Sequence, residues 1–537
     1  MKRKSLSLIA IVLTVCFTVS SFPLQALSLG TLSATDSVSD SESSDIFVVE
    51  EDITKRGEYE KHFLCSDGTY RAVTYAEPVH YYDSSTSTWQ DNDVALTLNA
   101  DSSRYEAQSG SFAVSFANAY AALALSAAGT MGEETSNALT TSGSASQSDA
   151  ASQAQTVAMT NGTYPISWTT AVKPSSTLFE SESSAFAEQA ASALTANTAA
   201  AVSGPIPAAS ASSLLTRTPT ASILTAEEAE ATAQQSFVGK PISDADVFAA
   251  ANRISVAEYG NIAQAAGQST GVSLRYSVSQ HKIKEDIVIS NKSAVTDFVT
   301  TLDVGALTAV KQEDGSVLLV DEYGDTAYTV GVPFMYDADY NVSYNVAVTV
   351  EQTGSVCRIT YAPDREWLNA AERVYPVVLD PTVTSSEYYA NIVDTYVTQA
   401  DSNNHSGEGN LVVGIKNGKL NRAYLRINNL PAIPAGVTPT SAQLLIKHGA
   451  NTTSGRAMTL YRVNSSWSPS SITYSNQPSA STSIGSCAFN TSNVRFTFSQ
   501  SQIQDLYTRV SNNTNYGFQI RYTSESTTNP DYNMLRS

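Results

Sequence analysis

Strand-like blocks in the last third of the chain decide its fold. They read Asp394-Thr395-Tyr396-Val397, Leu411-Val412-Val413-Gly414, Arg422-Ala423-Tyr424-Leu425-Arg426-Ile427, Ser441-Ala442-Gln443-Leu444-Leu445-Ile446, Leu460-Tyr461-Arg462-Val463 and Tyr516-Gly517-Phe518-Gln519-Ile520. Most of the blocks are rich in β-branched and aromatic residues, and polar residues separate them. The pattern predicts an all-β module over residues 384–537, and nothing in it resembles a catalytic motif.

The order of these blocks resembles the DNRLRE domain, also classed as carbohydrate-binding module family 96, which occurs in secreted bacterial surface proteins and some polysaccharide lyases. The resemblance also includes Trp467 and the segment Ile472–Pro478. It implies a jelly-roll-like β-sandwich that binds glycan. Such domains usually finish with one more strand after the last matched block, so we expect the sandwich to lack its last strand and the chain to be a fragment of a longer parent.

The module is basic although the chain is acidic. From Tyr388 onward eleven Lys and Arg stand against six Asp and Glu, a net charge of +5, while the whole chain carries −20 and the preceding residues therefore −25. A basic module attracts anionic ligands through its long-range field. Balance against the acidic remainder of the chain, or chance, is the alternative explanation.

The first 26 residues have the three parts of a secretory signal. Lys2-Arg3-Lys4 is the basic start, Leu6 to Val19 the apolar run, and Leu24-Gln25-Ala26 the cleavage region. The apolar run is too short to span a membrane comfortably. We therefore expect a secreted protein, extracellular or attached to the cell surface, with no stable membrane insertion after cleavage. The sparse cysteines Cys65, Cys357 and Cys487 do not form a disulfide framework.

Composition divides the rest of the chain before the module. Residues 27–56 are Ser- and Asp-rich and predict a disordered tail, and residues 57–118 alternate at period two and predict a β-rich segment. Residues 119–235 are a low-complexity Ala/Ser/Thr insertion, expected to be disordered because it buries little apolar surface. Within it, Tyr164–Trp168 is expected to return to the preceding sheet as a strand.

Two short helices and a second β-rich domain are expected next. Thr225 with Glu228 has capping-box spacing, and residues 236–268 show apolar positions at helical spacing after Ser243, so they predict a helical segment. Residues 269–383 predict a β-rich domain with hairpins at Asp314-Gly315 and Gly324-Asp325. Its final part resembles the region that precedes DNRLRE modules in clostridial surface proteins, some of which continue into RHS repeats.

Standard catalytic constellations are absent from the sequence, so we expect no enzymatic activity. There is no His-Glu-x-x-His helix, no Gly-x-Ser-x-Gly elbow and no phosphate-binding glycine loop. Cys65 with His62 or His80 is the one thiol and base pairing that the composition offers, and a buried structural thiol is the alternative.

Three acids of the module cluster near one polar loop. Asp394, Asp401 and Glu408 could supply the carboxylates that a hard cation prefers on a flexible loop. They predict a structural calcium site, although no cofactor is required, and a solvated polar loop is the alternative.

The strand Arg422–Ile427 carries the candidate glycan contacts. Its residues Ala423, Leu425 and Ile427 share one face, and Arg422, Tyr424 and Arg426 share the other. If the aliphatic face points to the core, the other face presents cations and a ring outward, where guanidinium groups grip carboxylates. The full predicted set for carbohydrate binding is Arg422, Tyr424, Arg426, Lys447, Arg462 and Trp467. The alternative is that the aromatic residues belong to the core.

These observations favour a secreted, non-catalytic surface or matrix protein. Its module is expected to bind a polysaccharide, an anionic one or a cell-wall glycan, and no nucleic acid. The alternative is a structural spacer or the N-terminal shell of a larger RHS-type or adhesin assembly that does not bind glycan itself.

Overall fold

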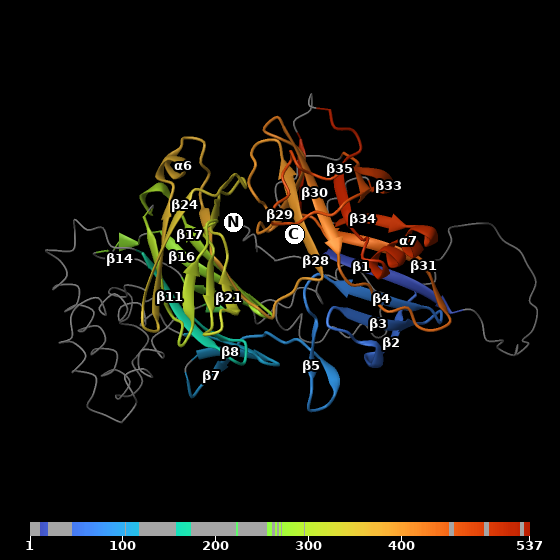
Figure 1. The fold of residues 1–537 in the computed structure, drawn as a ribbon, viewed down its shortest axis with the longest axis horizontal. Coiled ribbons are helices and arrows are strands. Elements are labelled where there is room, and N and C mark those ends of the chain that lie inside the picture. The colour runs from blue at the N-terminus through green and yellow to red at the C-terminus, as the bar shows by residue number, and fades with distance from the viewer. Residues whose placement is uncertain are drawn as a thin grey trace, which may run out of the picture. The chain divides into compact units, whose positions relative to one another are not determined.

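The computed structural model describes residues 46–102, 104–117, 157–172, 255–259, 271–294, 296–449, 456–487, 493–526 and 531–536, and the backbone alone of 11–19, 222–223, 264–265 and 268–269. Over these ranges the chain is built mostly of β-strands, with two α-helices, α6 (Arg365–Asn369) and α7 (Gln500–Ser511). The all-β prediction is therefore confirmed. The chain forms two compact units (Figure 1), unit 1 from Met1–Asn92, Gln234–Arg253 and Tyr389–Ser537, and unit 2 from Asp93–Ala233 and Ile254–Tyr388.

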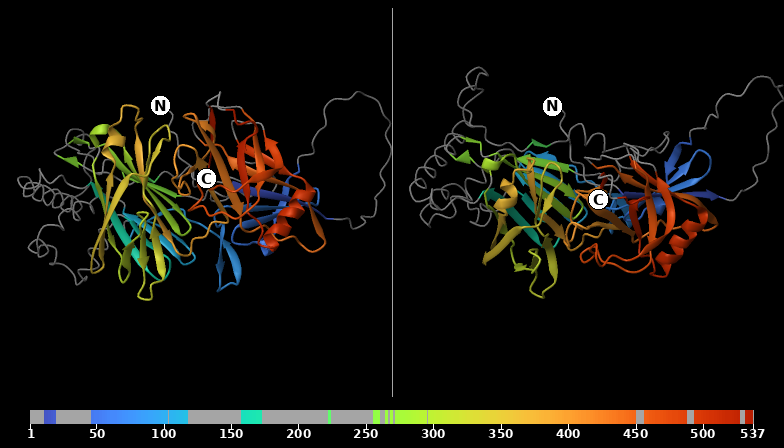
Figure 2. Two further views of the ribbon diagram at one scale, coloured as in Figure 1. Left: turned by 45° about the horizontal axis from the view of Figure 1, so that its top comes forward. Right: turned by 90° about the horizontal axis from the view of Figure 1, so that it is seen from above.

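One sheet of unit 1 combines strands from both ends of the chain. Its six strands run in the order β2 (Val48–Glu51), β3 (Glu60–Cys65), β4 (Tyr70–Tyr75), β1 (Ile11–Val19), β31 (Val437–Lys447) and β34 (Asn493–Phe498). In both views of Figure 2 the blue N-terminal strands lie beside the orange and red C-terminal strands. The segment 57–118 is divided between the two units after Asn92, because strand pairing and not composition decides where a compact unit ends.

Hydrogen bonds reinforce this joining of the two chain ends. The buried amide of Asn391 donates to Thr74 Oγ1 at 2.9 Å and to the Asn429 carbonyl at 3.2 Å. The backbone N–H of Asn391 donates to the Ala76 carbonyl at 2.8 Å. Residues 46–92 are therefore a structural part of the same unit as the module.

Strand β1 lies within the predicted signal segment. Its backbone pairs with β31 on one side and with β4 on the other. Cleavage after Ala26 stays a prediction. Within the part of the chain that the structure describes, no helix is long and apolar enough to cross a membrane.

The second sheet of unit 1 has seven strands and completes a β-sandwich. Phe498 of β34 meets Phe518 of this sheet edge to face at 5.6 Å, so side chains of the two sheets pack together. Helix α7 packs against β31 and starts with a capping box between Ser499 and Gln502. The strand order is β33 (Ala480–Cys487), β32 (Met458–Val463), β35 (Phe518–Tyr522), β30 (Lys419–Ile427), β29 (Asn410–Lys416) and β36 (Tyr532–Arg536), with β28 (Ile392–Thr398) also on β30.

One further strand follows the last of the matched blocks. Residues 532–536 form β36 and pair antiparallel with β29 from Asn410 to Gly414. The prediction that this strand is missing is wrong, because the apolar residues Met534 and Leu535 are fully buried in it.

Unit 2 is a second pair of sheets. The eight-stranded sheet runs β24 (Val346–Thr353), β25 (Val356–Pro363), β18 (Phe298–Asp303), β11 (Pro165–Val172), β10 (Val157–Thr160), β9 (Phe112–Ala117), β8 (Arg104–Ser109) and β7 (Thr97–Asn99). The other runs β12 (Ser222–Ile223), β13 (Ser255–Tyr259), β16 (Val272–Ser279), β17 (Lys282–Ile289), β27 (Thr382–Ser385), β21 (Thr326–Val330), β20 (Val317–Val320) and β19 (Thr308–Lys311), with β22 (Phe334–Tyr336), β23 (Val342–Ser343) and β26 (Val377–Asp380) attached.

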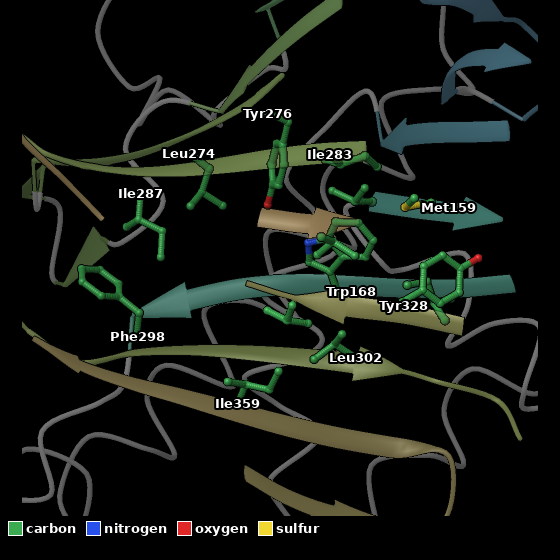
Figure 3. Packing of buried hydrophobic residues seen from close by; sticks show 14 of the residues in the cluster. Met159, Trp168, Leu274, Tyr276, Ile283, Ile287, Phe298, Leu302, Tyr328 and Ile359 are labelled. Atoms are coloured by element: carbon green, nitrogen blue, oxygen red, sulfur yellow. The ribbon is translucent and has the colours of Figure 1, made fainter. Parts of the chain in front are cut away.

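The two sheets of unit 2 share one apolar core. Figure 3 shows Trp168 of β11 among Tyr276 and Ile283 of the opposite sheet and Leu302 of its own. Trp168 is completely buried, and so is Glu285, whose carboxylate accepts a hydrogen bond from Tyr276 Oη at 3.0 Å.

Several strands and hairpins predicted from the sequence are found in unit 2, and part of one predicted helical segment is a strand instead. Strand β11 returns to β9 through β10, as predicted for Tyr164–Trp168, and the two predicted hairpins join β19, β20 and β21. Residues 255–259 are a strand, so the helical prediction for 236–268 is wrong there, because Ser255, Ala257 and Tyr259 are buried at period two. The predicted helix starts at Thr225 and Ser243 lie outside the described residues.

Candidate functional site

The strand predicted to carry the glycan contacts is buried on both faces at its centre, whereas Arg422 and Arg426 are partly exposed. Ala423, Leu425 and Ile427 are fully buried, which confirms the inward face. Tyr424, however, has 0% exposure, so the prediction that it points to solvent is wrong. Another segment of the chain must therefore cover the face of β30 on which Tyr424 lies.

The cover is the segment that follows β32. Trp467 and Ile472 from this segment pack with Tyr424 and Val463 in an apolar cluster, and Trp467 is only 9% exposed. The Trp467 indole donates to the Tyr516 carbonyl at 2.7 Å. The outward prediction for Trp467 is therefore wrong as well, because the chain folds back over the sheet.

Tyr424 is held by polar partners beneath this cover. Its hydroxyl donates to Gln477 Oε1 at 3.0 Å and accepts from Gln519 Nε2. Burial raises the pKa of Tyr424 to about 12. Tyr424 thus serves packing and an internal hydrogen-bond network.

Two of the predicted cations are already paired with carboxylates. Arg422 grips Glu525 bidentately, with Nε to Oε1 at 2.8 Å and Nη2 to Oε2 at 2.6 Å. Arg462 contacts Asp505 at 3.2 Å, and Asp505 also accepts from Arg509. Neither guanidinium is free to bind an anionic ligand without exchanging its partner.

Lys447 lies apart from the predicted row. It belongs to β31 of the six-stranded sheet, whereas Arg422 and Arg426 belong to the seven-stranded one. Burial lowers the pKa of the Lys447 ammonium, and nearby Arg536 lowers it further. The structure therefore does not bring Lys447 together with the other predicted contacts.

Arg426 remains as a cation without an acidic partner. It donates to Asn428 Oδ1 at 3.2 Å and to the Trp467 carbonyl at 3.3 Å, and its guanidinium lies 5.5 Å from the Trp467 ring. No carboxylate lies within ion-pair distance of Arg426 among the described residues. Partial burial lowers the pKa of this group, so an anion beside it would restore favourable charge interactions.

Sequence reasoning missed a second cation of this kind. Arg521 of β35 stacks on Tyr461 of β32, with its guanidinium carbon 4.0 Å from the ring centroid. Across the described part of the module it too has no carboxylate within ion-pair distance. The signal was present in the alternation of Gln519 and Arg521 along β35, which puts both on the covered side of the sheet away from Ile520.

Arg426, Trp467, Tyr461, Arg521 and the adjoining Ser481 and Ser483 are called here the arginine face. Tyr461 pairs with Gln519 on one side and with Ser483 of the edge strand β33 on the other. Ser481 and Ser483 are exposed and carry hydroxyls, whereas Thr482 lies opposite Arg462 and accepts from its Nη2 at 3.4 Å. Since Arg426 follows Leu425, the partner of Phe518, the two arginines are separated by about 13 Å along the strands. This face offers two cations with hydroxyl groups beside one of them.

The predicted calcium ligands do not form a metal site. Instead, the His405 ring contacts two of them, with Nδ1 at 2.5 Å from Glu408 Oε1 and Nε2 at 3.1 Å from Asp401 Oδ1. Asp394 is on β28, opposite Leu425. No group of three or more His, Cys, Asp or Glu among the described residues is arranged to hold a metal ion. The calcium prediction is wrong because an imidazolium neutralises the loop carboxylates.

His405 and Glu408 are buried, whereas Asp401 is exposed. Burial alone would lower the pKa of His405, but hydrogen bonds and charges of Asp401 and Glu408 raise it to about 9. The Tyr396 ring stacks on the imidazole at 4.2 Å, and its hydroxyl donates to Glu408 Oε2 at 2.8 Å. The cluster fixes the loop that follows β28.

Residues 385–534 match the model of carbohydrate-binding module family 96. The chain is also 28% identical, over 222 residues, to the tRNA nuclease WapA of Bacillus subtilis strain 168, with 38% of this chain and 9% of the relative covered. The tRNA(Glu)-specific nuclease WapA of B. subtilis subsp. natto and the tRNA3(Ser)-specific nuclease WapA of Bacillus spizizenii match with the same identity and coverage. The chain thus spans a small part of the length of these relatives.

Proposed function

We propose that the module binds an anionic polysaccharide through the arginine face, in a secreted protein that does no chemistry on its ligand. The match to a carbohydrate-binding family supports the ligand class. The observation that carries the anionic preference is that Arg426 and Arg521 lie over aromatic rings, 5.5 and 4.0 Å from the ring centroids, without a described carboxylate partner. Guanidinium groups bind carboxylate or sulfate oxygens bidentately, and the hydroxyls of Ser481 and Ser483 on β33 suit sugar hydroxyls.

Retention of the full chain on immobilised acidic and neutral polysaccharides tests this proposal. We expect binding to the acidic ones at low salt and weaker binding as salt rises, because exposed charges are screened within ~8–10 Å at ordinary ionic strength. Arg521→Gln should weaken binding about tenfold, the loss of one charge-assisted hydrogen-bonding group. Equal retention of the chain on neutral and acidic polymers at every salt concentration would contradict the anionic preference.

Arg495→Gln is the matched control. Arg495 is exposed on β34 of the six-stranded sheet and donates to Gln443, so the variant loses the same charge from the same unit without touching the arginine face. If Arg495→Gln weakens binding as much as Arg521→Gln, net charge and not a defined face is responsible.

Export is part of the same proposal. The basic start, apolar run and Ala26 support cleavage by a signal peptidase. N-terminal analysis of the protein recovered from culture medium should then begin at Leu27, and recovery of the chain only inside cells with Met1 intact would refute secretion.

A structural role in a larger assembly is the second candidate. The similarity to the WapA nucleases favours this role, because the matched region covers only 9% of the length of these much longer proteins. If this role is correct and glycan binding is not, the chain binds none of the polysaccharides, and neither arginine variant changes its behaviour.

A further inference from the structure

A lysine and two aspartates are buried together on the outer face of a sheet in unit 2. Along β17, Ile283, Glu285 and Ile287 face the main core, which places Lys284 and Asp286 on the opposite side. Lys284 is nevertheless only 9% exposed and Asp286 4%. Both are covered on the side of the sheet where β22 and β26 form a second, smaller apolar cluster, with Phe334, Tyr336 and Val378 at its centre.

The lysine nitrogen contacts both aspartates. Lys284 Nζ donates a short hydrogen bond to Asp286 Oδ1 and lies 2.7 Å from Asp380 Oδ2 of β26. Asp380 is 2% exposed, and its other oxygen accepts from Thr382 Oγ1 at 2.9 Å. Oδ2 has no hydrogen-bond partner among the described residues, so the nitrogen approaches it closely but outside the angles of a hydrogen bond.

Burial makes the charges of this trio costly. Two carboxylates and one ammonium would leave an uncompensated negative charge away from water. Burial raises the pKa of Asp380, and this favours its protonated form. Burial acts to lower the pKa of Lys284, but the two aspartates hold it above its ordinary value, so the nitrogen starts as an ammonium and Asp286 is the base beside it.

We propose that Lys284 and Asp380 are joined by an amide bond between Nζ and Cγ. Asp286 takes one proton from the ammonium, and the neutral amine attacks Cγ of the protonated Asp380. The C–O bond to the hydroxyl then breaks, a second proton passes from nitrogen to that oxygen, and one water molecule leaves. Atoms and charge balance without a further reactant, and the product trio carries an amide and a protonated Asp286, with no buried charge.

The surroundings favour this reaction. Two groups held in contact react with effective molarities of about 10⁵–10⁸ M when well oriented. The Lys284 nitrogen also lies 5.7 Å from the Tyr336 ring centroid, in apolar surroundings that exclude the water needed for the reverse reaction. The bond would link the adjacent strands β17 and β26 covalently, in addition to their backbone pairing.

The intact mass of the purified full chain, measured under denaturing conditions, tests the bond directly. We expect a mass lower by one water molecule than the sequence of the isolated chain requires. Trypsin should fail to cut after Lys284 and should yield segments 283–292 and 374–416 as one branched peptide. Fragmentation of this peptide would separate a Lys–Asp amide from loss of water within one segment.

Variants locate the chemistry. Lys284→Met and Asp380→Ala should each restore the full mass, and Asp286→Asn should leave most chains unlinked although both bonded residues remain. Lys282→Met, two residues earlier on β17, should keep the bond. The intact mass of the unaltered chain decides the proposal by itself, so the test still holds if one of the variants fails to fold. Full mass of the unaltered chain, with residues 285–292 and 374–416 recovered as separate linear peptides, would overturn it and leave a buried ion cluster.

Discussion

Replacement of His405 by Gln should destabilise unit 1 in a pH-dependent way. His405 links Glu408 and Asp401 while buried beneath Tyr396, and its pKa is raised to about 9. Gln keeps some hydrogen-bonding capacity but carries no charge. The buried carboxylate of Glu408 would then lose its cation while the exposed Asp401 carboxylate stays nearby, and an unpaired buried charge is costly.

The pKa values give the size and the sign of this effect. The difference between about 9 in the folded chain and the ordinary ~6.5, at ~1.4 kcal/mol for each pH unit, corresponds to about 3 kcal/mol. Since the folded pKa is raised, the stabilisation is complete below pH ~6.5 and disappears as pH rises toward ~9. The wild-type chain should therefore lose stability over this interval, and H405Q should show a much flatter dependence.

Urea unfolding of the full chain at a series of pH values, followed by the transition of unit 1, measures this difference. Wild type and H405Q should differ by about 3 kcal/mol near pH 6 and converge toward pH 9. Millimolar calcium should not shift the wild-type midpoint, because His405 already neutralises the carboxylates. Equal stability of the two proteins at pH 6, or a large stabilisation by calcium, would refute this account of the loop.

Three other substitutions test the fold and the site. Burial raises the pKa of Glu285 to about 7, so unit 2 should lose about 3 kcal/mol between pH ~4.5 and ~7, and Glu285→Gln should remove this dependence in pH-resolved denaturation. Gly517 has φ +77° and a Cβ there would lie 2.2 Å from the Leu425 carbonyl oxygen, so Gly517→Ala should cost about 2–4 kcal/mol in thermal unfolding. Arg422→Gln should cost about 1–2 kcal/mol, because the Glu525 pair is only partly buried, and an unchanged midpoint would show that this pair is not stabilising.

The local sequence pattern predicted where strands form and which face of β30 points to the core. It did not predict that the opposite face is also covered. The burial of Ala423, Leu425 and Ile427 follows from alternation within one strand. The burial of Tyr424 depends on a segment some forty residues away that returns over the sheet, and no short-range pattern encodes such a return.

The candidate site shows the same division. Arg426 was predicted as a glycan contact and has no carboxylate partner among the described residues. Arg422, in contrast, is paired with Glu525, more than a hundred residues later in the chain. Charge counting found the excess of cations in the module but could not find which of them already have an anion. Arg521 became a candidate only when its stacking on Tyr461 and its lack of a described acidic partner were seen together.

The isolated module should be less stable than unit 1, because residues 46–92 belong to the same unit. A fragment of residues 384–537 matches the family model but lacks residues 46–92, which belong to the same compact unit and accept hydrogen bonds from Asn391 at Thr74 and Tyr75. Without residues 46–92 the side-chain amide of Asn391 loses its bonds to Thr74 and Tyr75 and keeps the bond to the Asn429 carbonyl, so the polar cost is that of lost hydrogen bonds, about 1 kcal/mol each.

Removing residues 46–92 would also expose apolar surface, and this adds to the cost of the lost hydrogen bonds. Phe63, Val73 and Tyr75 are fully buried in unit 1, and the surface that they cover in the rest of the unit would be exposed to water. We expect the fragment to be unstable or insoluble when expressed alone, and to be rescued by co-expression with residues 46–92. A fragment that folds alone, with the urea midpoint of unit 1 in the full chain, would show that these N-terminal strands are an accessory layer and that the sandwich needs only its C-terminal strands.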